Sequence, residues 1–303
     1  MPSFFKELTI SLLKSINTSS TVFMTFLSVT LKPLINFETI FFLSNSLLIL
    51  GPPPCTTIIE RPNLLSTYIS DINVLNKLGL SIIVVHGGGP RIKRELDKKK
   101  IVSKFINGLR VTDKNIINTV EEVLIDFNYD IINSLKKLGC DALSFHTKND
   151  NIIEVEPEAE ELGFVGIPKK INSELIENAL SKNAVPIIAP LGLGKNNQTY
   201  NINGDTAANA IAKKLKSRRL LLMTNVEGVY DDKKKLISEI KPFDLKNLIE
   251  WKIVQGGMIP KIQNCVDAVE NGVRGVVILD GRKPHSILHE IFSDKGVGTL
   301  IRR

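Results

Sequence analysis

From residue 69 onward, short apolar runs alternate with longer segments whose apolar residues recur at helical spacing. The short runs are rich in β-branched residues and predict buried strands over residues 81–85, 185–190, 219–224 and 275–279. The longer segments predict helices over residues 69–78, 116–138, 205–215 and 258–270. This alternation predicts an α/β fold, a three-layer αβα sandwich with a mostly parallel central sheet.

A parallel sheet of this kind also predicts where a ligand binds. Ligands on such sheets lie beyond the carboxyl ends of the strands. The loops after Val85, Ala189, Thr224 and Leu279 are therefore expected to face one cleft.

The N-terminal part of the chain has a different composition. Residues 1–58 are rich in Ser, Thr, Phe and Leu, and Glu7 and Glu38 are their only acidic residues. Such a composition is typical of a transit peptide, or of a membrane segment around residues 41–50. That apolar run is too short, and too interrupted by Ser and Asn, to span a bilayer, so we expect no transmembrane helix.

A mirror relation with later sequence offers a second explanation. When codons for the segment VVHGGGP (84–90) are read on the opposite DNA strand, one base out of frame, they encode GPPPCTT, which is the segment 51–57. The same relation pairs the residues of 1–70, one by one and in reverse order, with the residues of 71–140. Its exceptions are Met1, Thr9, Leu12, Thr25 and Tyr68.

We infer that residues 1–70 translate the antisense arm of an inverted repeat and have no confident fold. The repeat arose by rearrangement or by a sequence-assembly error. A chance reading frame that was later recruited as structure is the remaining alternative.

The charge distribution and the cysteine spacing disfavour two classes of function, nucleic-acid binding and metal binding by cysteines. The net charge of +7 is spread over predicted helices rather than gathered in a stripe with aromatic residues, which disfavours nucleic-acid binding. The three cysteines, Cys55, Cys140 and Cys265, show no CxxC or metal-ligand spacing. We therefore predict no metal site from cysteines, and a reducing compartment.

Two loops carry candidate anion-binding chemistry. The glycines of His86–Gly89, between a strand and a helix, let backbone N–H groups approach a phosphate, although glycine triplets also form plain turns. Arg110 lies among turn residues in the segment 107–113. Its guanidinium could bind a carboxylate, or Arg110 could be a surface residue of a hairpin.

Two later loops add an acid and a base. Asp205 stands at a helix start, where it is either an N-cap or an acid aimed into the cleft beside Asn201 and Asn203. Lys261 lies in the first turn of a helix. A cation at that position is unfavourable by a few tenths of a kcal/mol, roughly, unless an anion is close.

In order and spacing these loops resemble the N-acetylglutamate kinases of the amino-acid kinase family, over residues 71–303. The matching motifs are HGGGP (86–90), NGLRVTD (107–113), LGFVG (162–166), APLG…QTYNINGDTAA (189–208), GGMIPK (256–261), DGRKPHS (280–286) and GVGT (296–299). The resemblance implies transfer of the γ-phosphoryl of ATP, with Mg²⁺, to the side-chain carboxylate of N-acetyl-L-glutamate. This reaction is a step of arginine biosynthesis.

The resemblance also implies a role for each matching residue. Gly87 and Gly88 would present backbone N–H groups to the substrate carboxylate and the moving phosphoryl group, and Arg110 would hold the α-carboxylate. Asn201 would lie near the acetamido group.

Asp205 would orient the catalytic lysines, and Lys261 would neutralise charge on the phosphoryl group. The residues expected on the nucleotide side are Thr224, Asn225, Gly228 and Gly257. Residues 71–200 would form mainly a substrate lobe, and residues 201–303 mainly a nucleotide lobe.

The sequence departs from the family at its N-terminal phosphate clamp. The family's lysine falls in register at Pro53, and its glycine pair at Cys55 and Thr56. We therefore expect the first strand and the lysine loop to be missing. Asn225 also stands where the family more often has Asp.

These departures leave a second hypothesis open, a catalytically impaired homologue that binds N-acetylglutamate or arginine without efficient phosphoryl transfer. An aspartokinase-like or carbamate-kinase-like substrate is a weaker alternative.

Relatives form dimers or hexamers, and the resemblance implies a homo-oligomer, an arginine effector and a PII-type signalling partner. The expected location is the plastid stroma, or the cytoplasm of an AT-rich bacterium.

Overall fold

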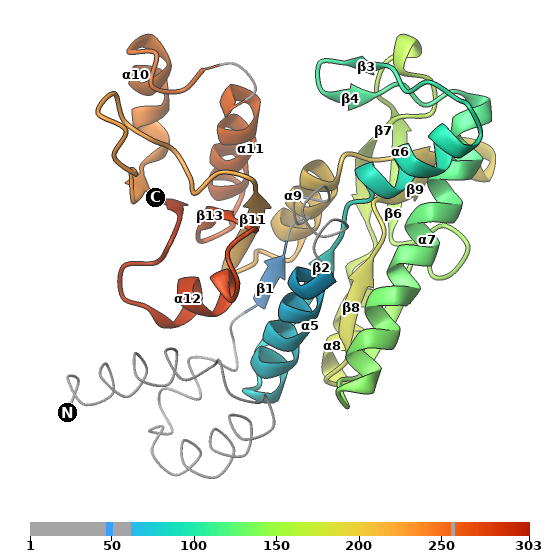
Figure 1. Cartoon of the computed structure of the whole chain (residues 1–303), viewed down its shortest axis with the longest axis horizontal. Helices are drawn as coiled ribbons and strands as arrows, with labels where there is room; N and C mark the ends of the chain where they lie inside the picture. The colour runs from blue at the N-terminus through green and yellow to red at the C-terminus, as the bar shows by residue number, and fades with distance from the viewer. Residues whose placement is uncertain (1–46, 51–61, 256–257) are drawn as a thin grey trace.

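The computed structural model describes residues 47–50, 62–255 and 258–303 (Figure 1). Its main sheet has eight strands in the order β12-β14-β13-β11-β1-β2-β8-β5. These strands are β1 (Leu47–Leu50), β2 (Ser81–Val85), β5 (Ala142–Phe145), β8 (Val185–Ile188), β11 (Arg219–Thr224), β12 (Glu239–Ile240), β13 (Val276–Asp280) and β14 (Thr299–Ile301). The only antiparallel pair in this sheet joins β13 to β14, which confirms the predicted, mostly parallel α/β sheet.

The first strand is present, so the expectation that it is missing is wrong. β1 pairs in parallel with β2, with Leu48 opposite Ile82, and with β11, with Leu48 opposite Arg219. A central parallel strand requires a short apolar run with its backbone groups paired on both sides, and LLIL meets that requirement whatever its origin. Pro53, Cys55 and Thr56, where we expect the family's lysine loop to be missing, lie outside the described residues.

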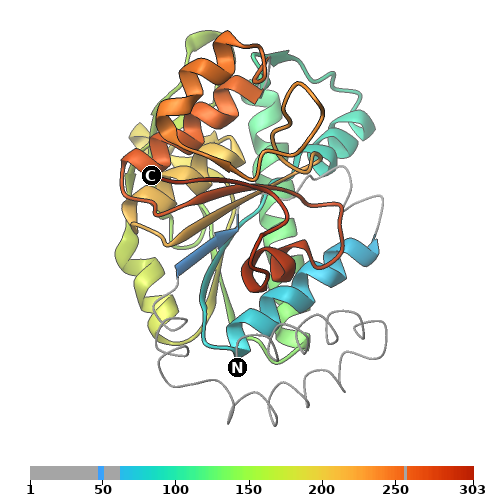
Figure 2. The ribbon, with the colours of Figure 1, turned by 90° about the vertical axis from the view of Figure 1, so that its left-hand side faces the viewer.

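Helices cover both faces of the sheet (Figure 2). One layer is formed by α5 (Pro62–Lys77), α7 (Lys114–Lys137) and α12 (Ser286–Phe292), and the other by α8 (Ser173–Ser181), α9 (Gly204–Lys214) and α11 (Met258–Glu270). Successive residues of β2 divide between the layers: Ile82 and Val84 pack with the first, Ile83 and Val85 with the second. Both faces of the sheet are therefore buried, as the predicted sandwich requires.

The remaining elements lie around the carboxyl edge of the sheet and on its flanks. They are α6 (Gly89–Lys98), the hairpin β3 (Phe105–Ile106) and β4 (Leu109–Arg110), the second sheet of β6 (Ile153–Pro157), β7 (Gly166–Ile171), β9 (Leu191–Leu193) and β10 (Thr199–Asn201), α10 (Leu245–Glu250), and the 3₁₀ turns η2 (Glu160–Leu162), η3 (Lys195–Asn197) and η4 (Pro242–Asp244). In Figure 1 the hairpin, α6 and α7 lie on one side of β1 and β2, and α10 and α11 lie on the other. The division into lobes at residue 200 stays a prediction.

The helices α5 and α7 begin before the predicted residues, whereas α11 begins at the predicted Met258. α7 begins at Lys114 because the Asp113 side chain accepts hydrogen bonds from the backbone N–H groups of Asn115 and Ile116. α5 begins at Pro62, inside the segment 1–70 for which we expected no confident fold. No helix among the described residues is long and apolar enough to cross a membrane.

A buried ion pair joins the first and last helices of one layer. The Asp71 carboxylate on α5 is fully buried, and its Oδ1 lies 2.7 Å from Nδ1 of His285, which precedes α12. The hydrogen bond to Asp71 raises the pKa of His285, and burial raises the pKa of Asp71. Folding therefore favours the protonated form of each group.

This pair makes stability dependent on pH. Because the pKa of His285 is raised, its contribution is complete below the unfolded value of about 6.5 and is lost as the pH rises through the folded value. We expect the free energy of unfolding of the native chain to fall between about pH 6 and about pH 9 more than that of an Asp71→Asn variant. Urea titrations of both proteins at the two pH values measure this, and equal slopes would contradict it.

Candidate active site

The carboxyl ends of β2, β8 and β11 open on a cavity of about 320 Å³. Its walls include Gly87–Gly89 after β2, Pro190 after β8, and Thr224 and Asn225 at the end of β11. Three of the four loops expected to face one cleft therefore do so. No residue of the loop after β13 lines the cavity.

The glycine loop and the N-terminus of α6 line this cavity. α6 begins at Gly89, and its N-cap, Gly88, provides no side-chain cap. The first N–H groups of a helix have no intrahelical acceptor, so those of Gly88 and Gly89, with the positive end of the helix dipole, are suited to bind an anion; Pro90 has no N–H group to add. His86 precedes the loop fully buried, and burial lowers its pKa to about 3, so the imidazole is neutral.

At Gly88 the surrounding structure leaves little room for a side chain. A Cβ at Gly88 would lie 2.5 Å from Cδ2 of Leu124, a buried residue of α7 that also lines the cavity. A Cβ at the neighbouring Gly89 would meet nothing within 4 Å. Close packing against α7 therefore sets the position of the loop.

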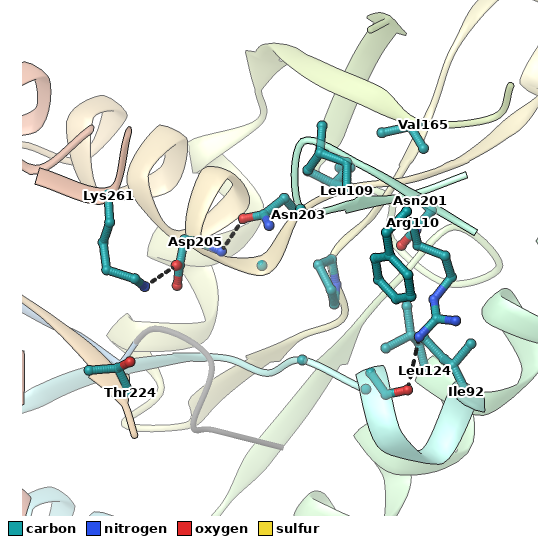
Figure 3. A pocket seen from close by; sticks show the side chains of 18 of the residues that line it. Ile92, Leu109, Arg110, Leu124, Val165, Asn201, Asn203, Asp205, Thr224 and Lys261 are labelled. Carbon is teal, nitrogen blue, oxygen red and sulfur yellow. Dashed lines mark hydrogen bonds and ion pairs between the residues drawn. The ribbon is translucent and has the colours of Figure 1, made fainter. Parts of the chain in front are cut away.

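Arg110 lies on strand β4 of the hairpin and lines the cavity. Its Nη2 donates to the carbonyl oxygen of Gly89 at 3.1 Å (Figure 3). Its Nη1 donates to Oγ of Ser103, and its Cζ lies 4.8 Å from the ring centroid of Phe105. Partial burial lowers its pKa, although the group stays charged. A carboxylate in the cavity would meet a guanidinium that is already held in place.

The side chains of Asp205 and Lys261 form an ion pair between the two helices α9 and α11. Nζ of Lys261 on α11 lies 2.5 Å from Oδ2 of Asp205 on α9, and both line the cavity (Figure 3). Asn203, not Asp205, caps α9: its Oδ1 accepts from the backbone N–H groups of Asp205 and Thr206. The carboxylate of Asp205 is thus free to pair with the lysine and offsets the unfavourable position of that cation in the first turn of α11.

Asn201 lines the cavity from β10, and its Nδ2 donates to Oγ1 of Thr112 at 3.2 Å. Of the residues expected on the nucleotide side, Thr224 and Asn225 also line it. Gly228 does not, since it packs against Thr299 in a turn, and Gly257 lies outside the described residues. The roles of these two glycines at a nucleotide stay predictions.

Sequence reasoning did not assign site roles to several residues that build the cavity. Leu124 and Ile92 belong to apolar helix faces and gave no signal of their own. Ser103, which accepts from Arg110, lies in a short connection without a motif. Asn203 was placed beside Asp205, and its position at a helix start was the signal for its capping role.

Comparisons with known proteins assign the chain to a family. The sequence profile of the "Amino acid kinase family" matches residues 56–280. The chain belongs to the amino acid kinase family. It is 53% identical over 246 residues to the acetylglutamate kinase of Pelagibacter ubique, covering 81% of this chain and 85% of the relative. It is 45% identical over 249 residues to that of Clostridioides difficile, covering 80% and 87%.

Solved structures share the fold of this family. N-acetylglutamate synthase from Neisseria gonorrhoeae, complexed with coenzyme A and L-arginine, superposes with a TM-score of 0.73 at 21% identity, over 87% of this chain and 62% of the synthase. Carbamate kinase from Giardia lamblia bound to AMP-PNP superposes with a TM-score of 0.63 at 16% identity, over 86% and 99%. At such identities the likeness concerns the fold alone.

The packing of the glycine loop gives a stability prediction. Replacement Gly88→Ala should lower the free energy of unfolding by about 1–3 kcal/mol, because the new methyl group overlaps Leu124. Gly89→Ala, one residue away in open space, is the matched control and should cost less than about 1 kcal/mol.

A double-mutant cycle identifies the cause. The cost of Gly88→Ala should shrink in a Leu124→Ala background, since Cδ2 of Leu124 is then absent. Denaturant titrations of the four proteins measure this. An unchanged cost in that background would show that Leu124 does not set the position of the loop.

Proposed function

We propose that this chain is an acetylglutamate kinase, which passes the γ-phosphoryl group of ATP to the side-chain carboxylate of N-acetyl-L-glutamate in arginine biosynthesis. One observation carries the proposal. Arg110 and the Asp205–Lys261 pair line the same cavity as the glycine loop, so a carboxylate anchor and a phosphoryl-neutralising cation share one anion site. Relatives named acetylglutamate kinase, at 53% and 45% identity, support the choice of substrate.

The residues proposed to bind N-acetylglutamate are inferred from the chemistry of the side chains that line the cavity. Arg110 binds the α-carboxylate, because a guanidinium held by Gly89 and Ser103 presents its remaining N–H donors in a fixed plane. Asn201 lies near the acetamido group. The apolar side chains of Ile92, Leu109 and Leu124 also line the cavity and suit the methylene groups of the substrate.

The phosphoryl side follows from charge. The backbone N–H groups of Gly87 and Gly88 stabilise the carboxylate and the moving phosphoryl group, and Lys261 neutralises the charge that spreads over the phosphoryl oxygens. Asp205 holds the ammonium of Lys261 in place through their ion pair. Phosphoryl transfer needs positioning and charge compensation rather than a covalent enzyme intermediate, and these residues supply both.

Thr224 and Asn225 border the nucleotide side. The described residues contain no group of three or more His, Cys, Asp or Glu side chains that could hold a metal ion. Mg²⁺ is seldom held in an all-protein cage, and it would enter the site with the nucleotide. When bound, it would neutralise charge on the nucleotide.

The catalytically impaired alternative rests on Pro53, which lies outside the described residues, and no comparison favours it over the enzyme. We also propose arginine as an effector, since a protein of the same fold has been solved with L-arginine. A homo-oligomer is proposed on the edge strand β5, where Leu143 is 42% exposed.

A substitution of Lys261 tests the proposed reaction. We expect Lys261→Met to lower kcat with N-acetylglutamate by roughly 10²–10³-fold, the cost of removing one transition-state donor. The matched control is Lys213→Met. Lys213 pairs with Asp267 at 2.6 Å between the same two helices, but neither residue lines the cavity. This variant should keep the native rate.

ADP release measured in a coupled assay reports both rates. Equal loss in the two variants would mean that the Asp205–Lys261 pair only holds α9 to α11. Turnover by the native chain with aspartate or carbamate, and none with N-acetylglutamate, would overturn the proposed substrate.

A further inference from the structure

Arg110 and Asn201 reach the cavity from elements far apart in the sequence, and Thr112 lies between them. Thr112 is fully buried and follows Arg110 by two residues. Its hydroxyl donates to the carbonyl oxygen of Arg110 at 2.9 Å and accepts from Nδ2 of Asn201 at 3.2 Å. One side chain thus bonds to both residues that, under the proposed function, hold the polar groups of the substrate.

The backbone of Thr112 is held by the same part of the structure that holds Asn201. Its N–H donates to Leu162 at 3.0 Å, and its carbonyl oxygen accepts from the N–H of Phe164 at 2.7 Å. The N–H of Asn201 in turn donates to the carbonyl oxygen of Phe164 at 2.9 Å. The turn at residues 162–164 therefore fixes Thr112 and Asn201 relative to each other.

Gly163 allows this turn to close on Thr112. Its φ is +67°, and a Cβ there would lie 2.6 Å from the carbonyl oxygen of Thr112. The contact is therefore a close approach of two backbone segments, which leaves Thr112 little freedom to move.

The hydroxyl also decides which way the Asn201 amide faces. A threonine hydroxyl has one proton to donate, and in Thr112 that proton goes to the carbonyl oxygen of Arg110. Towards Asn201 the hydroxyl can then only accept, so the NH₂ group of the amide faces Thr112 and Oδ1 is left for the cavity. An oxygen acceptor suits the N–H of an N-acyl group, whereas an exposed NH₂ group would not.

We propose that Thr112 is a positioning residue for substrate recognition. It sets the orientation of the Asn201 amide, and it ties that amide to the strand that carries Arg110. This inference rests on the proposed function, because it takes the N-acyl amino acid as the ligand. It adds to that function a residue that itself has no place in the cavity lining.

Steady-state kinetics of the full chain with N-acetylglutamate and ATP test the proposal. Thr112→Val should raise KM for N-acetylglutamate about tenfold, the worth of one hydrogen bond, and should leave kcat and KM for ATP within about threefold. Thr112→Ser keeps the hydroxyl and should restore KM to within about twofold of the native value. Thr119→Val is the matched control: Thr119 is a buried threonine on α7 whose hydroxyl accepts from Lys99, remote from Asn201.

A double-mutant cycle separates positioning from general stability. If Thr112 acts through Asn201, Thr112→Val should have no further effect on KM in an Asn201→Ala background. Multiplication of the two single effects would overturn the proposal, as would a serine variant as impaired as the valine variant. Thr112→Ala against Thr112→Ser gives the same comparison if the valine variant does not fold.

Calorimetric titration of N-acetylglutamate, together with the kinetics, distinguishes failure of the proposed role of Thr112 from failure of the proposed function. A native chain that turns over substrate beside a Thr112→Val variant with native KM would overturn the role of Thr112 alone. A native chain that binds N-acetylglutamate without phosphorylating it would overturn the proposed reaction, and the cycle would then be read from dissociation constants. Absence of binding to the native chain would overturn both.

Discussion

The site depends on the parallel pairing of β11, β1, β2 and β8 in the middle of the main sheet. The carboxyl ends of parallel strands lie at the same edge of a sheet, so the pairing of the strands alone brings together the segments after β2, β8 and β11. Helices on both faces bury the side chains of β2, β8 and β11. The glycine loop, Pro190 and Thr224 reach one cavity for this reason, and every other group of the site is placed relative to them.

Charge in the cavity is balanced by contacts within the protein. The 2.5 Å pair of Lys261 and Asp205 positions one cation, and the contacts of Arg110 with Gly89 and Ser103 position the other. Such preorganisation matters for phosphoryl transfer, since groups that need no rearrangement stabilise developing charge at least cost. Thr112 extends the same principle to the neutral side of the pocket, where the direction of one amide decides which ligand group it accepts.

The fold and the polar residues of the site could largely be predicted from the sequence, because apolar periodicity and glycine turns are local signals. Residues 81–85, 219–224 and 258–270 form elements with the bounds expected from their pattern. β1 could not be predicted from an antisense origin, which gives no reason to expect a strand, yet the apolar run LLIL is enough to form one. The partners of Arg110 and Asp205 could not be predicted, since Gly89 and Lys261 reach them through tertiary packing alone.

The central claim is that this cavity forms an acyl phosphate from a carboxylate and ATP. ³¹P NMR of the full chain with ATP, Mg²⁺ and N-acetylglutamate tests it most directly, because the acyl phosphate and ADP are observed without a coupling enzyme. The account predicts both signals in equal amount, and neither when N-acetylglutamate is omitted. Unchanged ATP, or ADP with inorganic phosphate alone at the first time point, would contradict it.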